Sequence, residues 1–197
     1  LEEVVRHVEK IRQLLRADQK TFAGILPGLL LKRKLVDETP EADITAAIVT
    51  EAVELVKKKM GIEGEITIVI LGGRGFIGKR VAGNLKSIQK SGVHIVDLDD
   101  RDKWPEGKTR KIIINVARHD TIPLYYDALR EGDIVLNEAY PAPSSEIISE
   151  IKSLNCHCFH VVGVEGAAFP RFTQGYEEGN PCCSAWSGKK AIIKKLT

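Results

Sequence analysis

The sequence predicts an α/β protein with a doubly wound, parallel sheet of the Rossmann type and a small helical segment at its N-terminus. The first observation is a continuous apolar, β-branched run over residues 66–71 that leads directly into a glycine-rich turn. Such a run is typical of a strand buried on both faces of a parallel sheet. The second observation is that short apolar runs then alternate with helix-like stretches, as βαβ crossovers require. We therefore assign residues 1–61 to the helical segment and residues 62–197 to a Rossmann-type α/β domain.

Two helices are predicted in the N-terminal segment. Residues 2–16 carry apolar side chains at helical spacing and begin with acidic residues, which suit the positive end of a helix. Residues 44–60 again carry apolar side chains at helical spacing, after Pro40 and Asp43, where a helix would begin. Three lysines lie near the end of this stretch, and Gly61 is expected to end the helix. The periodicity leaves open whether the two helices form a dimer face or a small lid over a substrate.

The predicted sheet contains five strands, separated by shorter helices. The strands are expected over residues 66–71, 93–96, 112–116, 134–136 and 159–164. Helices are expected over residues 78–90, 122–130 and 144–153, and an amphipathic helix over residues 185–196 closes the chain. The segment after Asp97 is short, which indicates that one βα unit of the usual fold is trimmed.

Composition and charge exclude several classes of partner. Lys and Arg total 29 and Asp and Glu total 27, so the 197-residue chain has a net charge of only +2. A dedicated nucleic-acid surface would show a clustered basic excess. No apolar stretch approaches the roughly 20 residues needed to cross a bilayer, and no secretory signal is visible. The four cysteines form two close pairs rather than a disulfide framework. We expect a cytoplasmic protein that binds neither nucleic acid nor membrane.

The glycine-rich turn carries the functional prediction. Gly73, Gly75 and Gly78 fit the pattern G-x-G-x-x-G between a buried strand and a helix. Gly73 is expected to allow the tight turn, Gly75 to let a pyrophosphate approach the backbone, and Gly78 to let the helix pack close to the strand. The N–H groups around Phe76 and Ile77, at the start of the helix, would then meet the phosphates. The alternative is a purely structural glycine turn.

Arg74 and an acidic residue after the second strand extend the predicted cofactor site. Arg74 is expected either to reach over the pyrophosphate or to be solvated. Asp97 lies 24 residues past Gly73, close to the separation of roughly 20 expected for the acid that binds the adenosine ribose. A carboxylate there favours NAD over NADP, with NADP still an option because Arg101 lies nearby. Asp99 and Asp100 are alternative ribose ligands, and a solvated acidic turn is the structural interpretation.

Polar residues follow the third and fourth strands. Asn115, Ala117 and Arg118 are expected to pass near the nicotinamide ribose, and Asn137 and Glu138 to line the same side. The alternative for the two asparagines is that they cap the loops that follow them.

Two residues are candidates for proton transfer. Tyr140 is placed to donate a proton to a carbonyl oxygen, and His119 is a candidate because histidine is the side chain most often used as a general acid or base. The structural alternatives are a packed Tyr-Pro turn and an exposed loop histidine.

The cysteines allow two further hypotheses. Cys182 and Cys183 precede the expected closing helix, where a thiol has a lowered pKa, although close packing of small residues explains them better. Cys156, Cys158 and His160 would share one face of a strand, but nothing completes a zinc signature. Buried core cysteines are the favoured interpretation, and no metal is predicted.

Three segments together resemble a known group of enzymes. They are the glycine turn, the stretch Asn-Glu-Ala-Tyr-Pro at residues 137–141 and the stretch Pro-Cys-Cys-Ser-Ala-Trp at residues 181–186. Over residues 20–195 the chain resembles the nucleotide-binding domain of shikimate-dehydrogenase-like oxidoreductases, and within that group the cyanobacterial long-chain acyl-carrier-protein reductases. The resemblance implies a Rossmann domain that serves NAD(P)-dependent reduction.

The chain also departs from that group. The substrate domain of the group corresponds here only to residues 1–61, and no shikimate-type pair of Lys and Asp is found. The nucleophilic cysteine of the acyl reductases precedes the nucleotide domain, whereas no cysteine precedes Cys156 here. The resemblance therefore carries the fold but not the catalytic groups.

The sequence thus predicts an NAD(P)-dependent oxidoreductase, or its cofactor-binding domain, that moves hydride to or from a small carbonyl-type substrate. A homodimer is one of the assemblies that the two N-terminal helices allow. The alternative is a regulatory or sensor module that binds the dinucleotide without turnover, and a third hypothesis is a structural remnant that no longer binds nucleotide.

Overall fold

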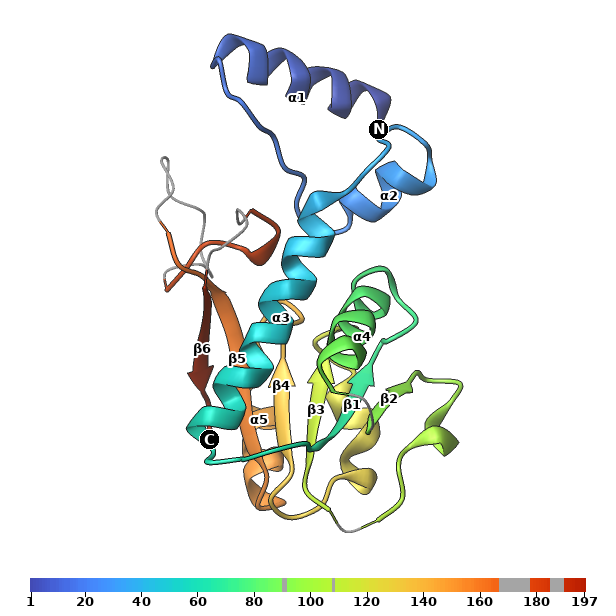
Figure 1. Ribbon diagram of the computed structural model, residues 1–197, viewed down its shortest axis with the longest axis vertical. Helices are drawn as coiled ribbons and strands as arrows, with labels where there is room; N and C mark the ends of the chain where they lie inside the picture. Colours follow the sequence, from blue (N-terminus) through green and yellow to red (C-terminus); the bar gives the residue numbers. More distant parts are fainter. Residues whose placement is uncertain (90–91, 108, 167–177, 185–189) are drawn as a thin grey trace.

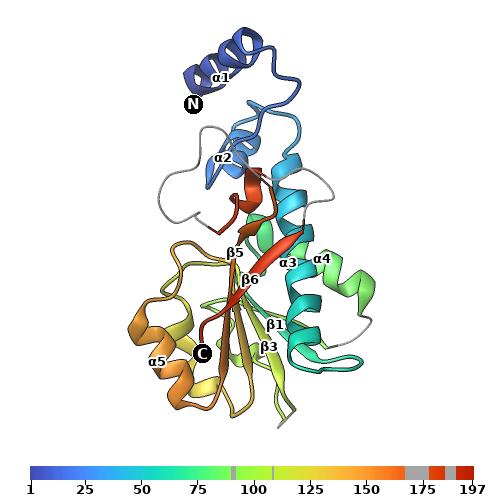
Figure 2. The same cartoon turned by 90° about the vertical axis from the view of Figure 1, so that its left-hand side faces the viewer.

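The protein is built on one six-stranded sheet with helices on both sides (Figures 1 and 2). The computed structural model describes residues 1–89, 92–107, 109–166, 178–184 and 190–197. The strand order is β2-β1-β3-β4-β5-β6; the first five strands in chain order are parallel, and β6 is antiparallel to β5. The strands are β1 (Thr67–Leu71), β2 (Val93–Val96), β3 (Lys111–Asn115), β4 (Ile134–Asn137), β5 (His157–Val164) and β6 (Ala191–Lys195).

The helices differ in how much of their surface they bury. The α-helices are α1 (Glu2–Leu14), α2 (Leu26–Lys32), α3 (Pro40–Lys59), α4 (Phe76–Ile88) and α5 (Ser145–Ser153), and the 3-10 helices are η1 (Arg101–Lys103), η2 (Ile122–Ala128) and η3 (Cys182–Ser184). Ten residues of α3 are buried, whereas α1 buries none and lies apart from the sheet (Figure 1). No helix in the described part of the chain is both long and apolar enough to cross a membrane.

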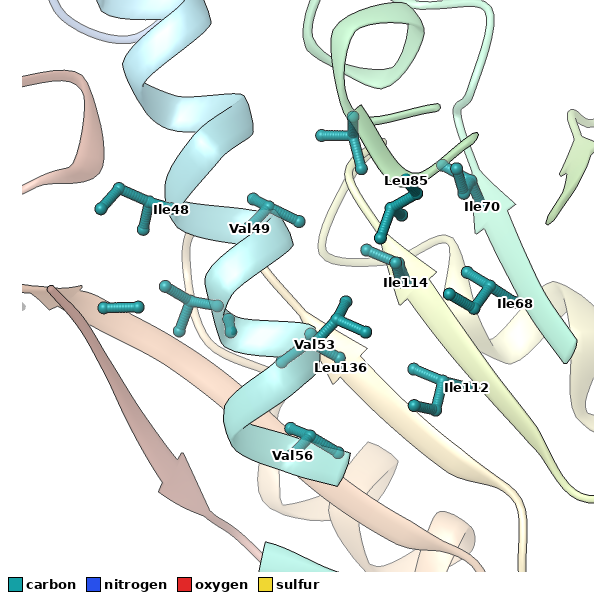
Figure 3. Close-up of a cluster of buried hydrophobic side chains, with 14 of the residues drawn as sticks. Ile48, Val49, Val53, Val56, Ile68, Ile70, Leu85, Ile112, Ile114 and Leu136 are labelled. Atoms are coloured by element: carbon teal, nitrogen blue, oxygen red, sulfur yellow. The ribbon is translucent and has the colours of Figure 1, made fainter. Parts of the chain in front are cut away.

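Each face of the sheet has its own apolar core. On one face, α3 and α4 pack on the strands through residues such as Val53, Leu85 and Ile112 (Figure 3). On the other face, Tyr125 of η2 and Ile151 of α5 pack against Val69 and its neighbours. Because side chains alternate along a strand, the fully apolar run of β1 supplies both cores. The predicted α/β class is therefore confirmed, with a mostly parallel sheet that is compatible with a Rossmann-like fold.

The C-terminal segment differs from the prediction. Residues 191–195 form β6 instead of part of an amphipathic closing helix, and residues 185–189 lie outside the described part of the chain. The pairing of Val161 with Ile193 shows why: the free edge of β5 accepts a strand, and the β-branched pair Ile192 and Ile193 favours one. In addition, the Ala191 N–H donates to the Glu51 carboxylate of α3 at 2.9 Å. The spacing of apolar residues along the sequence gives no information about these tertiary contacts.

Of the other predicted helices, one is of a different kind and one begins at a different residue. The stretch expected as a helix over residues 122–130 is the 3-10 helix η2, with Pro123 at its start and a buried Tyr125. The helix expected over residues 44–60 begins earlier, at Pro40, because proline fits the first turn of a helix, where its missing N–H costs no hydrogen bond.

The join between β1 and α4 is too tight for side chains. Gly72 has φ +81°, and a Cβ there would lie 2.7 Å from the Ala117 Cβ. A Cβ on Gly73 would lie 2.7 Å from a methyl group of Ile95. A Cβ on Gly78 would overlap the Gly72 carbonyl oxygen. The close packing predicted for Gly78 is confirmed, while the backbone conformation that favours glycine belongs to Gly72, and not to Gly73.

This packing makes Gly78 and Gly83 of α4 a matched pair for substitution. We expect Gly78→Ala to lower the free energy of unfolding by about 2 kcal/mol or more, because a backbone oxygen must move. Gly83→Ala, on the same helix with nothing within 4 Å of its Cβ, should stabilise the protein by up to about 1 kcal/mol. Urea denaturation of both variants measures the difference. Equal effects of the two substitutions would contradict the assigned packing.

Candidate functional site

Two cavities open at the carboxyl edge of the sheet. The first has a volume of about 460 Å³ and the second about 270 Å³, and both are lined by Ala117 and Arg118 from the loop after β3. In the sheet, β2 lies on one side of β1, and β3 and β4 lie on the other side. The chain therefore runs from the end of β1 toward one edge of the sheet, to β2, and from the end of β3 toward the opposite edge, to β4. Ligands of open α/β sheets bind at such a point, outside the carboxyl ends of the strands.

The first cavity collects residues from most of the chain. Its walls come from the start of α3, the start of α4, the loops after β3 and β4, and the end of β5. The ionisable or polar side chains that line it are those of Glu41, Thr45, Arg118, His119, Glu138, Tyr140, His160, Cys182 and Cys183. Both predicted proton-transfer residues, Tyr140 and His119, therefore reach the same cavity.

The N-terminal segment forms one wall of the first cavity. Gly24, Ile25 and Pro27 line the cavity, and the buried Glu41 carboxylate accepts a hydrogen bond from the Phe22 N–H at 2.9 Å. Arg80 joins α4 to the start of α3 beside this wall. Its Nε donates to Asp43 at 2.7 Å, and its guanidinium lies 4.3 Å from the centre of the Phe76 ring. Sequence reasoning missed Glu41, because only the packed structure turns the first turn of α3 toward the sheet edge.

The start of α4 lies at the wall of the first cavity. Gly75 is the N-cap residue and provides no side-chain cap, and the two residues after it, Phe76 and Ile77, line the cavity. The Gly75 N–H itself is used by the Gly72 carbonyl at 2.9 Å. The first-turn N–H groups of a helix have no acceptor within the helix, and together with the helix dipole they favour an anion.

Arg74 does not extend over the helix start. Its backbone N–H and its Nε both donate to Asp97 Oδ2, at 3.2 and 3.0 Å, and its guanidinium also pairs with Asp99 and Asp100. The hydrogen bond to Asp97 is the largest cause of the raised pKa of Arg74. Of these three acids, Asp97 and Asp99 line the second cavity and Asp100 does not. Arg101, which follows Asp100 in the chain, pairs with Asp127 at 2.8 Å.

The two predicted asparagines hold strand ends together. Asn115 Nδ2 donates to Asn137 Oδ1 and to the Arg118 carbonyl oxygen, both at 2.8 Å, and Asn137 Nδ2 donates to the Ala139 carbonyl oxygen at 2.6 Å. His160 Nδ1 lies 2.9 Å from the Asn137 carbonyl oxygen. Burial is the main cause of the lowered pKa of His160. Both asparagines are fully buried and line neither the first nor the second cavity, and their hydrogen bonds are of the kind that loop-capping residues make.

Glu138 has the most unusual electrostatic environment in the first cavity. Burial raises its pKa from the ordinary value of 4.5 to about 7, and no other group contributes to the shift. Among the described residues no cation lies within ion-pair distance of it, while Arg118 pairs with Asp120 at 2.5 Å. Sequence reasoning placed Glu138 at this edge from its position after β4. Its titration near neutrality depends on burial and has no signal in the sequence.

The cysteines are not activated. Burial raises the pKa of both Cys182 and Cys183, and Cys182 begins the three-residue η3 instead of preceding a long helix. The hypothesis of a lowered thiol pKa is therefore wrong, because desolvation dominates at both thiols, and residues 191–195 of the expected closing helix form a strand. Ala185 and Trp186 lie outside the described residues.

The other cysteine pair belongs to the core. Burial raises the pKa of Cys156 to about 11 and that of Cys158 to about 12, and both pack in the cluster below α5 and η2. This confirms the interpretation of these two residues as core cysteines. Within the described ranges, no three acidic, cysteine or histidine side chains come together as metal ligands.

Comparison of the chain with protein-family models, curated proteins and solved structures finds no match.

The raised pKa of Glu138 predicts a specific dependence of stability on pH. Because the folded-state pKa lies above the unfolded value, the carboxyl destabilises the fold as pH rises from about 4.5 through 7. We expect Glu138→Gln to have nearly no effect at pH 4 and to stabilise the protein by about 3 kcal/mol at pH 8. Denaturant unfolding at the two pH values measures this difference.

Glu146→Gln is the matched control. Hydrogen bonds from Ser144 and Ser145 lower the pKa of Glu146, so the same substitution there should destabilise the protein slightly at pH 8. If Glu138→Gln has the same effect at both pH values, Glu138 is not buried as described.

Proposed function

We propose that the protein binds a nicotinamide dinucleotide across the carboxyl edge of its sheet and uses it to transfer hydride to or from a small carbonyl-type substrate. The observation that carries the proposal is the pair of cavities that adjoin the glycine turn and share Ala117 and Arg118. We further propose that the sheet is a doubly wound Rossmann sheet with one βα unit trimmed, since β2 is the edge strand next to β1.

The residues at the turn fit a dinucleotide. The uncapped start of α4 offers N–H groups to a pyrophosphate, and the glycines keep side chains out of its approach. The second cavity, with Asp97 and Tyr125 in its walls, suits the adenosine end. The first cavity, which is larger and mostly apolar, would then take the nicotinamide end and the substrate.

The charges around the second cavity support NAD over NADP. Asp97 and Asp99 would repel a 2′-phosphate, and Arg74, the basic side chain nearest to them, is already paired with both. Asp97 Oδ2 takes both hydrogen bonds from Arg74, and no described residue donates to Oδ1. That second oxygen would accept a hydroxyl of the ribose.

The first cavity supports acid–base chemistry beside the cofactor. A bound nicotinamide would supply or accept the hydride. Glu138, with a pKa of about 7, would hold the proton that a carbonyl oxygen gains on reduction and would take it back in the reverse direction. Tyr140 and His119 lie at the exposed side of the same cavity and would orient the substrate. The apolar walls would exclude water from the reacting atoms.

Substitution of Asp97 tests the cofactor assignment. We expect Asp97→Ala to weaken NADH binding by roughly tenfold to hundredfold, because a hydrogen bond between the ribose and a carboxylate is lost. NADPH binding should stay unchanged or improve, since the repulsion falls and Arg74 loses a partner. Calorimetric titration of both cofactors measures the two affinities.

Asp100→Ala is the control for that titration. It also removes a carboxylate from Arg74, but Asp100 does not line the second cavity. We expect it to leave NADH affinity within about threefold of the unsubstituted protein. Equal weakening of NADH binding by both substitutions would mean that Asp97 acts only through Arg74.

Dinucleotide sensing without turnover is the second candidate function. The observation that favours it is the small contribution of the N-terminal segment, whose one ionisable side chain at the cavity, Glu41, is bonded to the Phe22 N–H. A panel of small aldehydes and ketones distinguishes the two functions by the loss of NADH absorbance. If NADH raises the melting temperature while no carbonyl compound oxidises it, the sensor function is supported.

A further inference from the structure

The wall that α3 contributes to the first cavity carries a buried carboxylate. Glu41 lies in the first turn of α3, at the same end of the molecule as the carboxyl ends of the parallel strands (Figure 1). It is only 4% exposed, and it lines the first cavity. The first turn of a helix favours a negative charge, because its N–H groups have no acceptor within the helix. Glu41 therefore places a carboxylate beside the space that a substrate would fill.

One oxygen of this carboxylate is open to the cavity. Glu41 Oε1 accepts the hydrogen bond from the Phe22 N–H at 2.9 Å, and no described residue donates to Oε2. Within the described part of the chain, every fully enclosed side-chain oxygen or nitrogen has a hydrogen-bond partner. Oε2 has no such partner, so it is not enclosed by the protein, and the cavity that Glu41 lines gives access to it.

The arginines nearest to this wall are bound to other groups. Arg80 Nε donates to Asp43 at 2.7 Å and not to Glu41. Arg118 is the one arginine or lysine among the described residues that line the first cavity; it pairs with Asp120 at 2.5 Å, and its side chain is 75% exposed. A buried carboxylate without a cation is costly. A cation that enters the cavity would therefore gain a charge-assisted hydrogen bond to Glu41 without displacing a partner.

Glu138 lies on a different part of the cavity wall. Burial is the main cause of the raised pKa of Cys183, and the charges of Glu138 and Glu41 both add to it. Glu41 is not among the causes of the raised pKa of Glu138. Both carboxylates are therefore near Cys183 without lying against each other. A ligand in this cavity can offer a different chemical group to each of them.

We propose that the first cavity takes a small carbonyl compound that carries a protonated amino group, with its ammonium on Glu41 and its carbonyl oxygen at Glu138. This inference rests on the proposed function, because it names the substrate class of the same site. A substrate carboxylate would instead meet two acidic side chains and, among the described residues, no buried cation. On reduction, the carbonyl carbon would gain hydride from the nicotinamide and the oxygen would gain the proton of Glu138, which gives an amino alcohol and the oxidised cofactor. Glu41 would select the substrate and take no part in the chemistry.

The first experiment compares three small molecules that differ in charge. Butylamine, butanol and butyrate are positive, neutral and negative at neutral pH, and each is titrated into ¹⁵N-labelled protein. Butylamine should bind about tenfold or more tightly than butanol, and butyrate should bind most weakly. Butylamine should also shift the amide resonance of Phe22, because that N–H is bonded to Glu41. Equal binding of the three molecules, or tightest binding of butyrate, would overturn the proposal.

The second experiment removes the charge of Glu41. Glu41→Gln keeps an oxygen that can accept the Phe22 N–H, and it should abolish the preference for butylamine over butanol. Glu51→Gln is the matched control, since Glu51 is another carboxylate of α3 that accepts a backbone N–H, that of Ala191 at 2.9 Å, but it does not line the cavity. It should leave the preference unchanged, and equal effects of the two substitutions would overturn the proposal. Thermal unfolding shows whether each variant folds; if Glu41→Gln does not, the three titrations of the unsubstituted protein still decide.

Turnover separates this inference from the proposed function. With NADH, β-aminopropionaldehyde should be reduced with a kcat/KM about tenfold or more above that of butyraldehyde, which has a methyl group in place of the ammonium. Equal kcat/KM values would support the proposed function and overturn the ammonium site at Glu41. Selective binding of butylamine without oxidation of NADH by either aldehyde would support the ammonium site and contradict the proposed function alone.

Discussion

The close approach of Gly78 to the Gly72 carbonyl oxygen is the constraint on which the candidate site depends. It holds the first turn of α4 directly above the end of β1 and leaves no room for a side chain between them. Gly75 provides no side-chain cap for that turn, and its residues Phe76 and Ile77 line the first cavity. The same turn packs Gly72 against Ala117, so the loop after β3 is fixed relative to the helix start. The position of the helix start beside the cavity therefore depends on the glycines of the turn.

A second constraint aligns the strand ends around that space. Asn115 and Asn137 stand opposite each other at the carboxyl ends of β3 and β4, and His160, in the middle of β5, stands opposite Asn137. Hydrogen bonds between these side chains link the three strands. Buried amides that satisfy one another specify one arrangement, because an unpaired amide in this position would be costly. They hold the loops that carry Arg118 and Glu138 while remaining outside the cavity.

Much of this architecture is predictable from local pattern. The apolar run before the glycines is β1 within one residue, and the packing role of Gly78 follows from the motif alone. The C-terminal β6 was not predictable, because its strand state depends on the free edge of β5 and on Glu51, more than 100 residues away in the chain. The titration of Glu138 and the pairing of Arg74 with the acidic turn likewise depend on burial and on loop geometry. Sequence pattern located the candidate site, and tertiary packing set its chemistry.

The central claim is that the first turn of α4 binds the diphosphate of a dinucleotide. Titration of uniformly ¹⁵N-labelled protein with NADH, followed through its amide resonances, tests it most directly. The account predicts that the largest shifts occur at Phe76, Ile77 and Gly78, with smaller shifts around Asp97 and Ala117. An unchanged spectrum at millimolar NADH, or shifts confined to residues away from this turn, would contradict it.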